Sequence, residues 1–237
     1  MSEMNFRENV MSYGLKKAVA YLNDDPDRNI PRLVDWVEKF DKKSMIKPQM
    51  EAVREVIQDQ DNNWYQLIKS LWTDIDDGVR AKLFENFVVN EAIIGQQRQR
   101  KAKVENECNV PFAILMDPTS ACNLHCTGCW AAEYGNKLNM SYEKLNDIIE
   151  QGKALGTYFY IYSGGEPLVR KADIIRLCEA HQDGGFLAFT NATWLIESFA
   201  EERLVGKTSI QAITWEGLGG ETEAGPAKGP SRPVVRA

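Results

Sequence analysis

The spacing of apolar residues changes near residue 110 and divides the chain into two parts. In the first part apolar residues recur every three or four positions, a period typical of helices. Five helices are expected there, over residues 6–22, 30–40, 50–58, 64–72 and 79–97. Aromatic residues of this part share the helical spacing, so we interpret them as core rather than as a ligand site: Trp36, Trp64, Trp72, Phe84 and Phe87. The pattern predicts an all-helical N-terminal domain over residues 1–107.

Two of these helices have a clear apolar face. In the helix over 64–72 this face carries Leu67, Ile68 and Leu71. In the helix over 79–97, which is the longest, five apolar side chains are expected to point inward: Leu83, Phe84, Phe87, Val88 and Ile93. Because such stripes are normally buried against other elements, both faces are expected to belong to the core.

Beyond residue 110, short apolar runs alternate with helical segments. Strands are expected over 112–116, 158–162, 186–189 and 210–215. Helices are expected between them, the first beginning after Ser141, whose side chain suits the N-cap position. Alternating strands and helices are typical of parallel sheets with right-handed crossovers. The predicted fold class is therefore α/β, a parallel (βα) partial barrel of about four strands that follows the helical domain.

Residues 217–237 have a different composition, with five of the 17 glycines and three of the nine prolines. Such segments are typically disordered, so a disordered tail is expected over 218–237 and the α/β core over 108–217. At about 30 residues per βα unit of an eight-unit barrel, this core has room for only three to four units. We therefore expect a truncated copy of a longer barrel, prone to aggregate through its last strand.

The composition narrows the classes of partner. The chain has 28 Lys and Arg against 34 Asp and Glu, a net charge of −6, so no basic face for nucleic acid is expected. The N-terminus is polar, and no apolar run approaches the roughly 18 residues of a membrane span. The sequence thus predicts no nucleic-acid or membrane partner and a cytoplasmic location.

Three of the five cysteines lie close together, at Cys122, Cys126 and Cys129, in the spacing C-x3-C-x2-C. Without an export signal, such a group indicates a metal site rather than a disulfide framework. A [4Fe–4S] cluster takes one ligand per iron, so three thiolates would leave one iron free for a cofactor or substrate. The alternative is a zinc site in which His125 is the fourth ligand.

Further polar groups follow the other predicted strands: Ser163–Pro167, Thr190–Asn191 and Glu216. The carboxyl ends of parallel strands meet at one edge of a sheet, which is where such folds bind ligands. The cysteine loop and these groups are therefore expected to converge. Outside this edge, Cys178 is expected to be a buried thiol, Cys108 a linker residue, and His181 a contact at a helix C-terminus.

The segments DPTSACNLHCTGCWAAEYG and YSGGEPLVRK carry a resemblance to a known family. They resemble the radical S-adenosylmethionine (radical SAM) superfamily, in particular its Fe–S oxidoreductases and peptide-modifying maturases. The resemblance covers roughly residues 108–217. It implies a [4Fe–4S] cluster on Cys122, Cys126 and Cys129, with S-adenosylmethionine on the open iron. Reductive cleavage would give a 5′-deoxyadenosyl radical that abstracts hydrogen from a peptide or small molecule, with flavodoxin or ferredoxin as electron donor.

The resemblance also implies how S-adenosylmethionine is held. Its methionine amino group would meet Gly164, Gly165 and Glu166, with Pro167 stiffening the end of the turn. Its carboxylate would lie near the polar pair Thr190 and Asn191, and its ribose near Thr214 and Glu216.

Two features depart from the family pattern. Gly128 stands where many members have an aromatic residue that packs on adenine, and four strands are predicted where a family core has about six βα units. Two functions are therefore left open. The chain is a radical SAM enzyme, or it is a non-catalytic fragment that binds only an iron–sulfur cluster or zinc.

Overall fold

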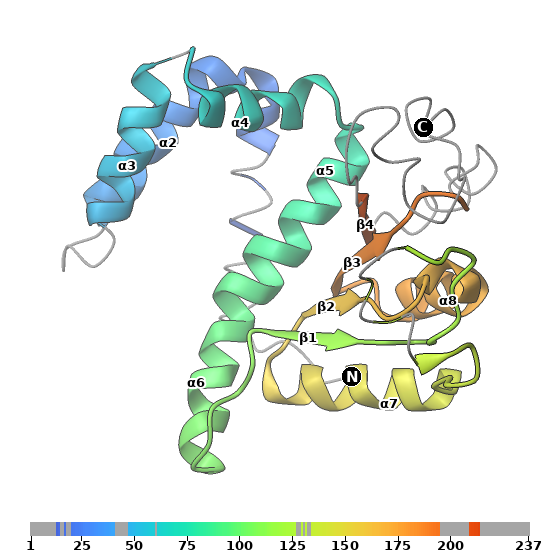
Figure 1. Cartoon of the computed structure of the whole chain (residues 1–237). Helices are drawn as coiled ribbons and strands as arrows, with labels where there is room; N and C mark the ends of the chain where they lie inside the picture. Colours follow the sequence, from blue (N-terminus) through green and yellow to red (C-terminus); the bar gives the residue numbers. More distant parts are fainter. Residues whose placement is uncertain are drawn as a thin grey trace. The chain divides into compact units, whose positions relative to one another are not determined.

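The computed structural model describes residues 13–14, 17, 20–40, 47–59, 61–126, 129, 131, 134–194 and 209–213. The chain divides into two compact units, Met1–Phe84 and Glu85–Ala237 (Figure 1). Thr214, Glu216, the helix expected near 199–204 and the tail lie outside the described residues. The domain limits predicted at 107 and 217 stay predictions.

The described residues of the first unit are helical, as the spacing predicts. Its helices are α2 (Pro26–Phe40), α3 (Lys47–Gln58), α4 (Asn63–Thr73) and α5 (Asp77–Phe84). The Asn62 side chain caps α4 by accepting a hydrogen bond from the backbone N–H of Trp64. None of the described helices is long and apolar enough to cross a membrane.

The expected buried face of α4 is wrong for Leu67 and Leu71, whereas its third residue, Ile68, is half-buried. Trp64, Leu67 and Leu71 are 65%, 56% and 40% exposed, whereas Tyr65 is buried. The Tyr65 hydroxyl donates a hydrogen bond to the Asp27 carboxylate on α2. This contact turns the Tyr65 side of α4 toward α2, so Leu67 and Leu71 on the other side point outward.

The second unit begins with the π-helix η1 (Glu85–Gly95), which continues into α6 (Gln96–Glu105). The helix predicted over 79–97 is confirmed. The residues expected to point inward are half-buried, and among them Phe87 packs edge-to-face on Phe159 of the sheet. The buried positions of η1 are other residues, and half of them are polar: Asn86, Val89, Asn90, Glu91, Ile94 and Gly95. A π-helix has more residues per turn than an α-helix, so a set chosen at α-helical spacing loses phase along it.

The polar side of η1 binds backbone groups at the amino-terminal edge of the sheet. The Asn86 and Asn90 amides donate to carbonyl oxygens of the turn 182–184. The Glu91 carboxylate accepts from the Tyr158 N–H, and burial raises the pKa of this carboxyl. Buried backbone groups need partners, and these three side chains supply them.

The four predicted strands form one parallel sheet in chain order, among the described residues. They are β1 (Ala113–Met116), β2 (Phe159–Tyr162), β3 (Gly185–Thr190) and β4 (Ser209–Ile213). Neighbours pair in parallel with registers such as Met116 beside Tyr162 and Thr190 beside Ile213. The α/β class with a parallel sheet is confirmed, and closure into a partial barrel stays a prediction.

Helices α7 (Tyr142–Leu155) and α8 (Lys171–Ala180) pack on one face of this sheet (Figure 1). Their apolar side chains join those of β1, β2 and β3 in one core cluster: Met116, Leu145, Ile149, Tyr160, Tyr162, Leu168, Ile174, Leu177, Cys178, Phe186 and Ala188. The predicted N-cap is confirmed, since the Ser141 hydroxyl accepts from the Lys144 N–H. Cys178 is buried, as predicted.

His181 lies at the C-terminus of α8, as predicted, and its side chain is buried. Its Nε2 lies 3.0 Å from the Asn146 Oδ1, and its Nδ1 lies 3.4 Å from both the Lys153 Nζ and a Glu150 oxygen. Burial lowers the pKa of the imidazole. The His181 ring, through its contact with Asn146, therefore connects the end of α8 to α7.

Candidate functional site

The carboxyl ends of β1 and β2 meet through backbone hydrogen bonds. The Gly165 N–H donates to the Thr119 carbonyl at 3.0 Å, and the Glu166 N–H donates to the Ala121 carbonyl at 2.8 Å. The turn after β2, residues 163–166, is called the glycine turn below. It holds the chain that leads into the cysteine loop. The convergence expected from parallel strand order is present for these two loops.

Gly164 and Gly165 make this close approach sterically possible. Gly164 has φ +100°, and a Cβ on it would lie 2.6 Å from the Thr119 carbonyl oxygen. A Cβ on Gly165 would lie 2.6 Å from the Ser120 carbonyl oxygen and closer still to that of Ala121. Real side chains do not tolerate such contacts. The two glycines therefore allow the turn to pack against the start of the cysteine loop.

Glu166 connects the same turn to the end of β3. Its side chain is 1% exposed. One carboxylate oxygen accepts from the Leu168 N–H at 2.9 Å and the Thr190 hydroxyl at 2.8 Å, and the other accepts from the Asn191 N–H at 2.8 Å. Pro167, also buried, begins the short 3-10 helix η3 (Pro167–Arg170) that follows. Glu166 is thus the residue through which the ends of β2 and β3 are joined.

Asn191 extends this connection to the first cysteine. Its amide Nδ2 lies 3.9 Å from the Cys122 Sγ and donates to the Asn123 Oδ1 at 3.0 Å. Its Oδ1 accepts from the Thr193 N–H and hydroxyl. Thr190 and Asn191, both predicted site residues, therefore lie beside Glu166 and Cys122 at the same edge of the sheet.

The cysteine loop places Cys122 and Cys126 half-buried and Cys129 exposed, all as free thiols. The Cys129 N–H donates a hydrogen bond to the Cys126 carbonyl at 3.2 Å, so these two residues lie close together in space. In their present arrangement, no three His, Cys, Asp or Glu side chains of the described residues could hold a metal ion. Three thiols on one loop at a ligand-binding edge nevertheless match the donor set of an iron–sulfur cluster.

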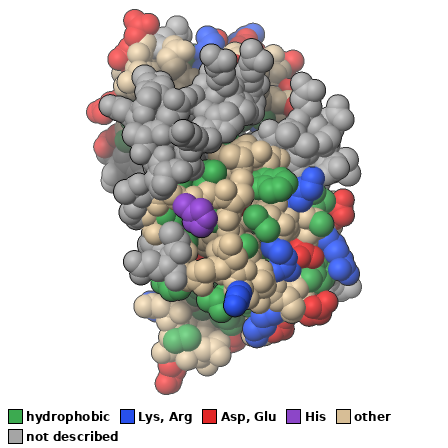
Figure 2. Space-filling model, turned by 45° about the vertical axis from the view of Figure 1, so that its right-hand side comes forward, with side chains coloured by type: hydrophobic (Ala, Val, Ile, Leu, Met, Phe, Trp, Pro, Cys, Tyr) green, Lys and Arg blue, Asp and Glu red, His purple; other side chains and the backbone are tan. Residues whose placement is uncertain are grey.

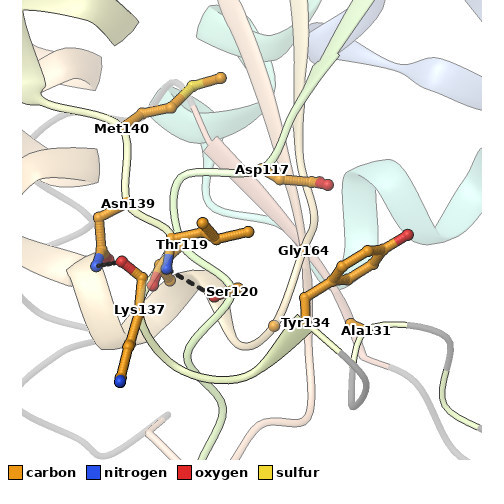
Figure 3. A pocket seen from close by; sticks show the side chains of 11 residues that line it. Asp117, Thr119, Ser120, Ala131, Tyr134, Lys137, Asn139, Met140 and Gly164 are labelled. Atoms are coloured by element: carbon orange, nitrogen blue, oxygen red, sulfur yellow. Dashed lines mark hydrogen bonds between the residues drawn. The ribbon is translucent and has the colours of Figure 1, made fainter.

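A cavity of about 530 Å³ lies beside the turn after β2 (Figure 3). Its lining comes from the end of β1, the cysteine loop, the segment before α7, and the glycine turn: Asp117, Thr119, Ser120, Ala131, Tyr134, Lys137, Leu138, Asn139, Met140, Gly164 and Gly165. A volume of this size suits a small-molecule ligand. The cavity adjoins the predicted site residues Gly164 and Gly165 directly.

Asp117 is the residue of this cavity that the sequence interpretation missed. Its Oδ1 is buried and, among the described residues, has no hydrogen-bond partner. Burial raises the pKa of this carboxyl. Its position in the sequence could have identified it, because an acidic residue directly after a buried parallel strand lies at the ligand-binding edge of the sheet.

Charged side chains are mixed on the face of the molecule that Figure 2 shows. In its coloured part, Lys and Arg are interspersed with Asp and Glu rather than gathered into one basic patch. Hydrophobic side chains, other uncharged side chains and backbone cover much of the surface between them.

Residues 116–210 match the family model of the radical SAM superfamily. This match runs from the last residue of β1 to the start of β4 and includes the cysteine loop and the glycine turn. The segment therefore belongs to the radical SAM superfamily.

Two curated relatives are similar to part of the chain. One is an uncharacterized protein of Archaeoglobus fulgidus, 39% identical over 90 residues, which are 36% of this chain and 21% of that protein. The other is the AdoMet-dependent heme synthase of Methanosarcina barkeri, 26% identical over 118 residues, 48% of this chain and 34% of that protein. The matched part of this chain spans about a third or less of each relative.

Solved structures with partial similarity include two peptide complexes. One is SuiB of Streptococcus suis bound to the precursor peptide SuiA, with TM-score 0.41 and 24% identity, covering 50% of this chain and 27% of SuiB. The other is anSMEcpe with bound AdoMet and Cp18Cys peptide, with TM-score 0.40 and 21% identity, covering 48% of this chain and 34% of that one.

Proposed function

We propose that this chain takes part in radical chemistry that starts from S-adenosylmethionine. Cys122, Cys126 and Cys129 are the proposed ligands of a [4Fe–4S] cluster. Once bound and reduced by its donor, such a cluster would supply one electron to S-adenosylmethionine, whose C5′–S bond would break into methionine and a 5′-deoxyadenosyl radical. The radical abstracts hydrogen from a substrate, for which a peptide or a small molecule is proposed. Flavodoxin or ferredoxin is the proposed electron donor.

One observation carries this proposal. The cysteine loop, the glycine turn after β2 and the polar end of β3 are joined at the carboxyl edge of the sheet, in a segment that matches the radical SAM family. A loop that supplies three thiolates needs a rigid start if the thiolates are to lie at adjacent corners of one cluster. The hydrogen bonds from Gly165 and Glu166 to the residues just before Cys122 provide this support.

The chain's own residues have proposed roles in binding and orientation. Gly164, Gly165 and Pro167 shape the turn beside the cavity. Asn191 presents its amide next to Cys122, and Thr190 donates its hydroxyl to Glu166. Ribose contacts from Thr214 and Glu216, which lie outside the described residues, are proposed from the family resemblance alone.

Reconstitution tests the cluster first. The full chain is incubated anaerobically with iron and sulfide and desalted, and its iron and sulfide contents are measured. We expect about four irons per chain, with the broad visible absorption of an iron–sulfur cluster. Cys126→Ala should lose the cluster, and Cys178→Ala, which removes a buried thiol of the core, should keep it.

Turnover tests the chemistry next. The reconstituted chain is reduced with dithionite in the presence of S-adenosylmethionine, and 5′-deoxyadenosine is measured by chromatography. Formation that depends on Cys126 supports the proposed function. A chain that takes up one zinc ion and no cluster, or a cluster without 5′-deoxyadenosine formation, would instead favour the non-catalytic alternative.

A further inference from the structure

Three polar side chains beside Cys122 form a closed ring of hydrogen bonds between the cysteine loop and the loop after β3. The Asn123 Nδ2 donates to the Thr193 hydroxyl at 2.7 Å. The Thr193 hydroxyl donates to the Asn191 Oδ1 at 2.7 Å, and the Asn191 Nδ2 donates to the Asn123 Oδ1 at 3.0 Å. Each side chain of this polar ring donates once and accepts once within it. Two of its members, Asn123 and Thr193, lie outside the predicted site residues.

The polar ring fixes the direction in which the Asn191 amide faces. Its Oδ1 also accepts from the Thr193 N–H at 3.0 Å, so both donors of Thr193 hold the oxygen side of the amide. The nitrogen side therefore faces the cysteine loop, where it lies 3.9 Å from the Cys122 Sγ. An amide nitrogen carries two N–H groups. One of them serves Asn123, and the other is directed to the sulfur.

The loop after β3 is itself held in place by backbone hydrogen bonds. The Asn191 N–H donates to the Glu166 carboxylate at 2.8 Å, and the Ala192 N–H donates to the Thr190 hydroxyl at 3.1 Å. Ala192 is buried and has φ +63°, a conformation that is costly for a non-glycine residue and persists only where the surroundings fix it. The polar ring therefore connects the first cysteine to a fixed part of the sheet edge.

We propose that the polar ring positions the Cys122 sulfur as a cluster ligand by directing an Asn191 N–H at it. This inference rests on the proposed function, and it makes Asn123 and Thr193 positioning residues. Side chains that contact a metal ligand orient that ligand and change how tightly the metal is held. The Cys122 Sγ also accepts from the Leu124 N–H at 3.4 Å. With Asn191, two N–H groups from two different loops therefore face this sulfur.

A hydrogen bond to a ligand sulfur has an electronic effect as well as a positional one. Reduction adds negative charge to an iron–sulfur cluster, and an N–H group directed at a ligand sulfur stabilises that charge. Hydrogen bonds to the sulfurs are accordingly among the factors that set the reduction potential of such clusters. An intact polar ring should therefore raise the reduction potential and also slow the loss of iron.

The first test breaks the polar ring at Thr193, the member that does not contact Cys122. Thr193→Val has nearly the same shape but no hydroxyl, and Thr193→Ser keeps the hydroxyl. Each full chain is reconstituted with iron and sulfide, and loss of its visible absorption is followed anaerobically with an excess of ferrous chelator. Thr193→Val should lose its cluster about tenfold faster than the wild type, and Thr193→Ser should lose it at about the wild-type rate.

The second test measures the reduction potential of the same proteins by dye-mediated titration. In Thr193→Val the equilibrium constant for reduction should fall about threefold, which is about 28 mV at 59 mV per tenfold for one electron. Thr193→Ser should keep the wild-type potential. Faster loss of iron at an unchanged potential would show that the ring only stabilises the loop, and would overturn the proposed contact with Cys122.

Asn123→Ala breaks the same ring from the cysteine loop. Asn123 is exposed, so this variant tests the proposal even if Thr193→Val does not fold. It should show the same two changes, faster loss of the cluster and a lower reduction potential. An Asn123→Ala protein with the wild-type rate and potential would overturn the proposal.

The outcomes distinguish this inference from the function beneath it. If the wild type takes up no iron–sulfur cluster, the proposed function fails and this inference fails with it. If the wild type holds a cluster that Thr193→Val retains equally well and at the same potential, the proposed function stands and the role of the polar ring is overturned. If Thr193→Val and Asn123→Ala change both quantities while Thr193→Ser restores them, the role is supported.

Discussion

Replacing Glu166 by Gln should destabilise the second unit before any ligand is bound. Gln has almost the same shape, but its amide has one acceptor oxygen and one NH2 group. The oxygen can still accept from the Leu168 N–H and the Thr190 hydroxyl. The NH2 group then faces the Asn191 N–H, which donated to the carboxylate at 2.8 Å. One hydrogen bond is therefore lost, and two become bonds to a neutral acceptor.

The size of the effect follows from these three bonds. A hydrogen bond to a charged group contributes roughly 1 kcal/mol more than a neutral one, which gives about 2 kcal/mol for the two retained bonds. A buried donor left without a partner costs a further ~1–3 kcal/mol. The free energy of unfolding should therefore fall by about 3–5 kcal/mol in total.

Hydrogen exchange of the cluster-free full chain measures this loss where it occurs. Peptides from β2 and β3 should exchange faster in Glu166→Gln, because the variant loosens the connection between these strands. The matched control is Glu179→Gln, which makes the same chemical change on the exposed side of α8 and should exchange like the wild type. A Glu166→Gln protein with wild-type exchange but weakened S-adenosylmethionine binding would refute this joining role and leave Glu166 with ligand contact alone.

Three further predictions concern other parts of the second unit. Cys126→Ala should lose the iron of the reconstituted chain and Cys178→Ala should not, as measured by iron content. Gly156→Ala should lower the free energy of unfolding in urea by more than ~1 kcal/mol, since Gly156 has φ +101° and a Cβ there would lie 2.7 Å from the Gly95 carbonyl oxygen. Burial lowers the pKa of His181, so the folded state disfavours its protonated form and stability should fall as pH drops below about 6.5, the unfolded value. His181→Gln should weaken this pH dependence in denaturation measured between pH 5 and pH 7, and an unchanged slope would contradict the assignment.

Local sequence signals determined the order and type of the elements in the second unit. Each expected strand is present, because short apolar runs between helical segments have few other stable solutions in a parallel sheet. The Ser141 cap could be predicted for a similar reason, since its hydroxyl bonds a backbone N–H only three residues away. The convergence of the cysteine loop and the glycine turn followed from strand direction alone.

The outward face of α4 and the buried face of η1 were decided by contacts that the local pattern does not contain. Tyr65 is buried because its hydroxyl meets Asp27, 38 residues away in sequence. Asn86 is buried because its amide reaches carbonyls nearly 100 residues further along the chain. Helical spacing identifies an apolar stripe, but the neighbours that a helix meets decide which of its sides is covered.

For Glu166 and Asp117 as well, the sequence determined the position and only the tertiary structure determined the contacts. The sequence placed Glu166 after a strand, at the correct edge, and nothing local distinguishes a ligand contact there from an internal one. Only the folded chain brings Thr190 and Asn191, 24 and 25 residues away, onto its oxygens. Only the folded chain also leaves the Asp117 Oδ1 buried beside a cavity with no described partner. Hydrogen-bond satisfaction depends on every donor within about 3 Å, and sequence spacing cannot supply that list.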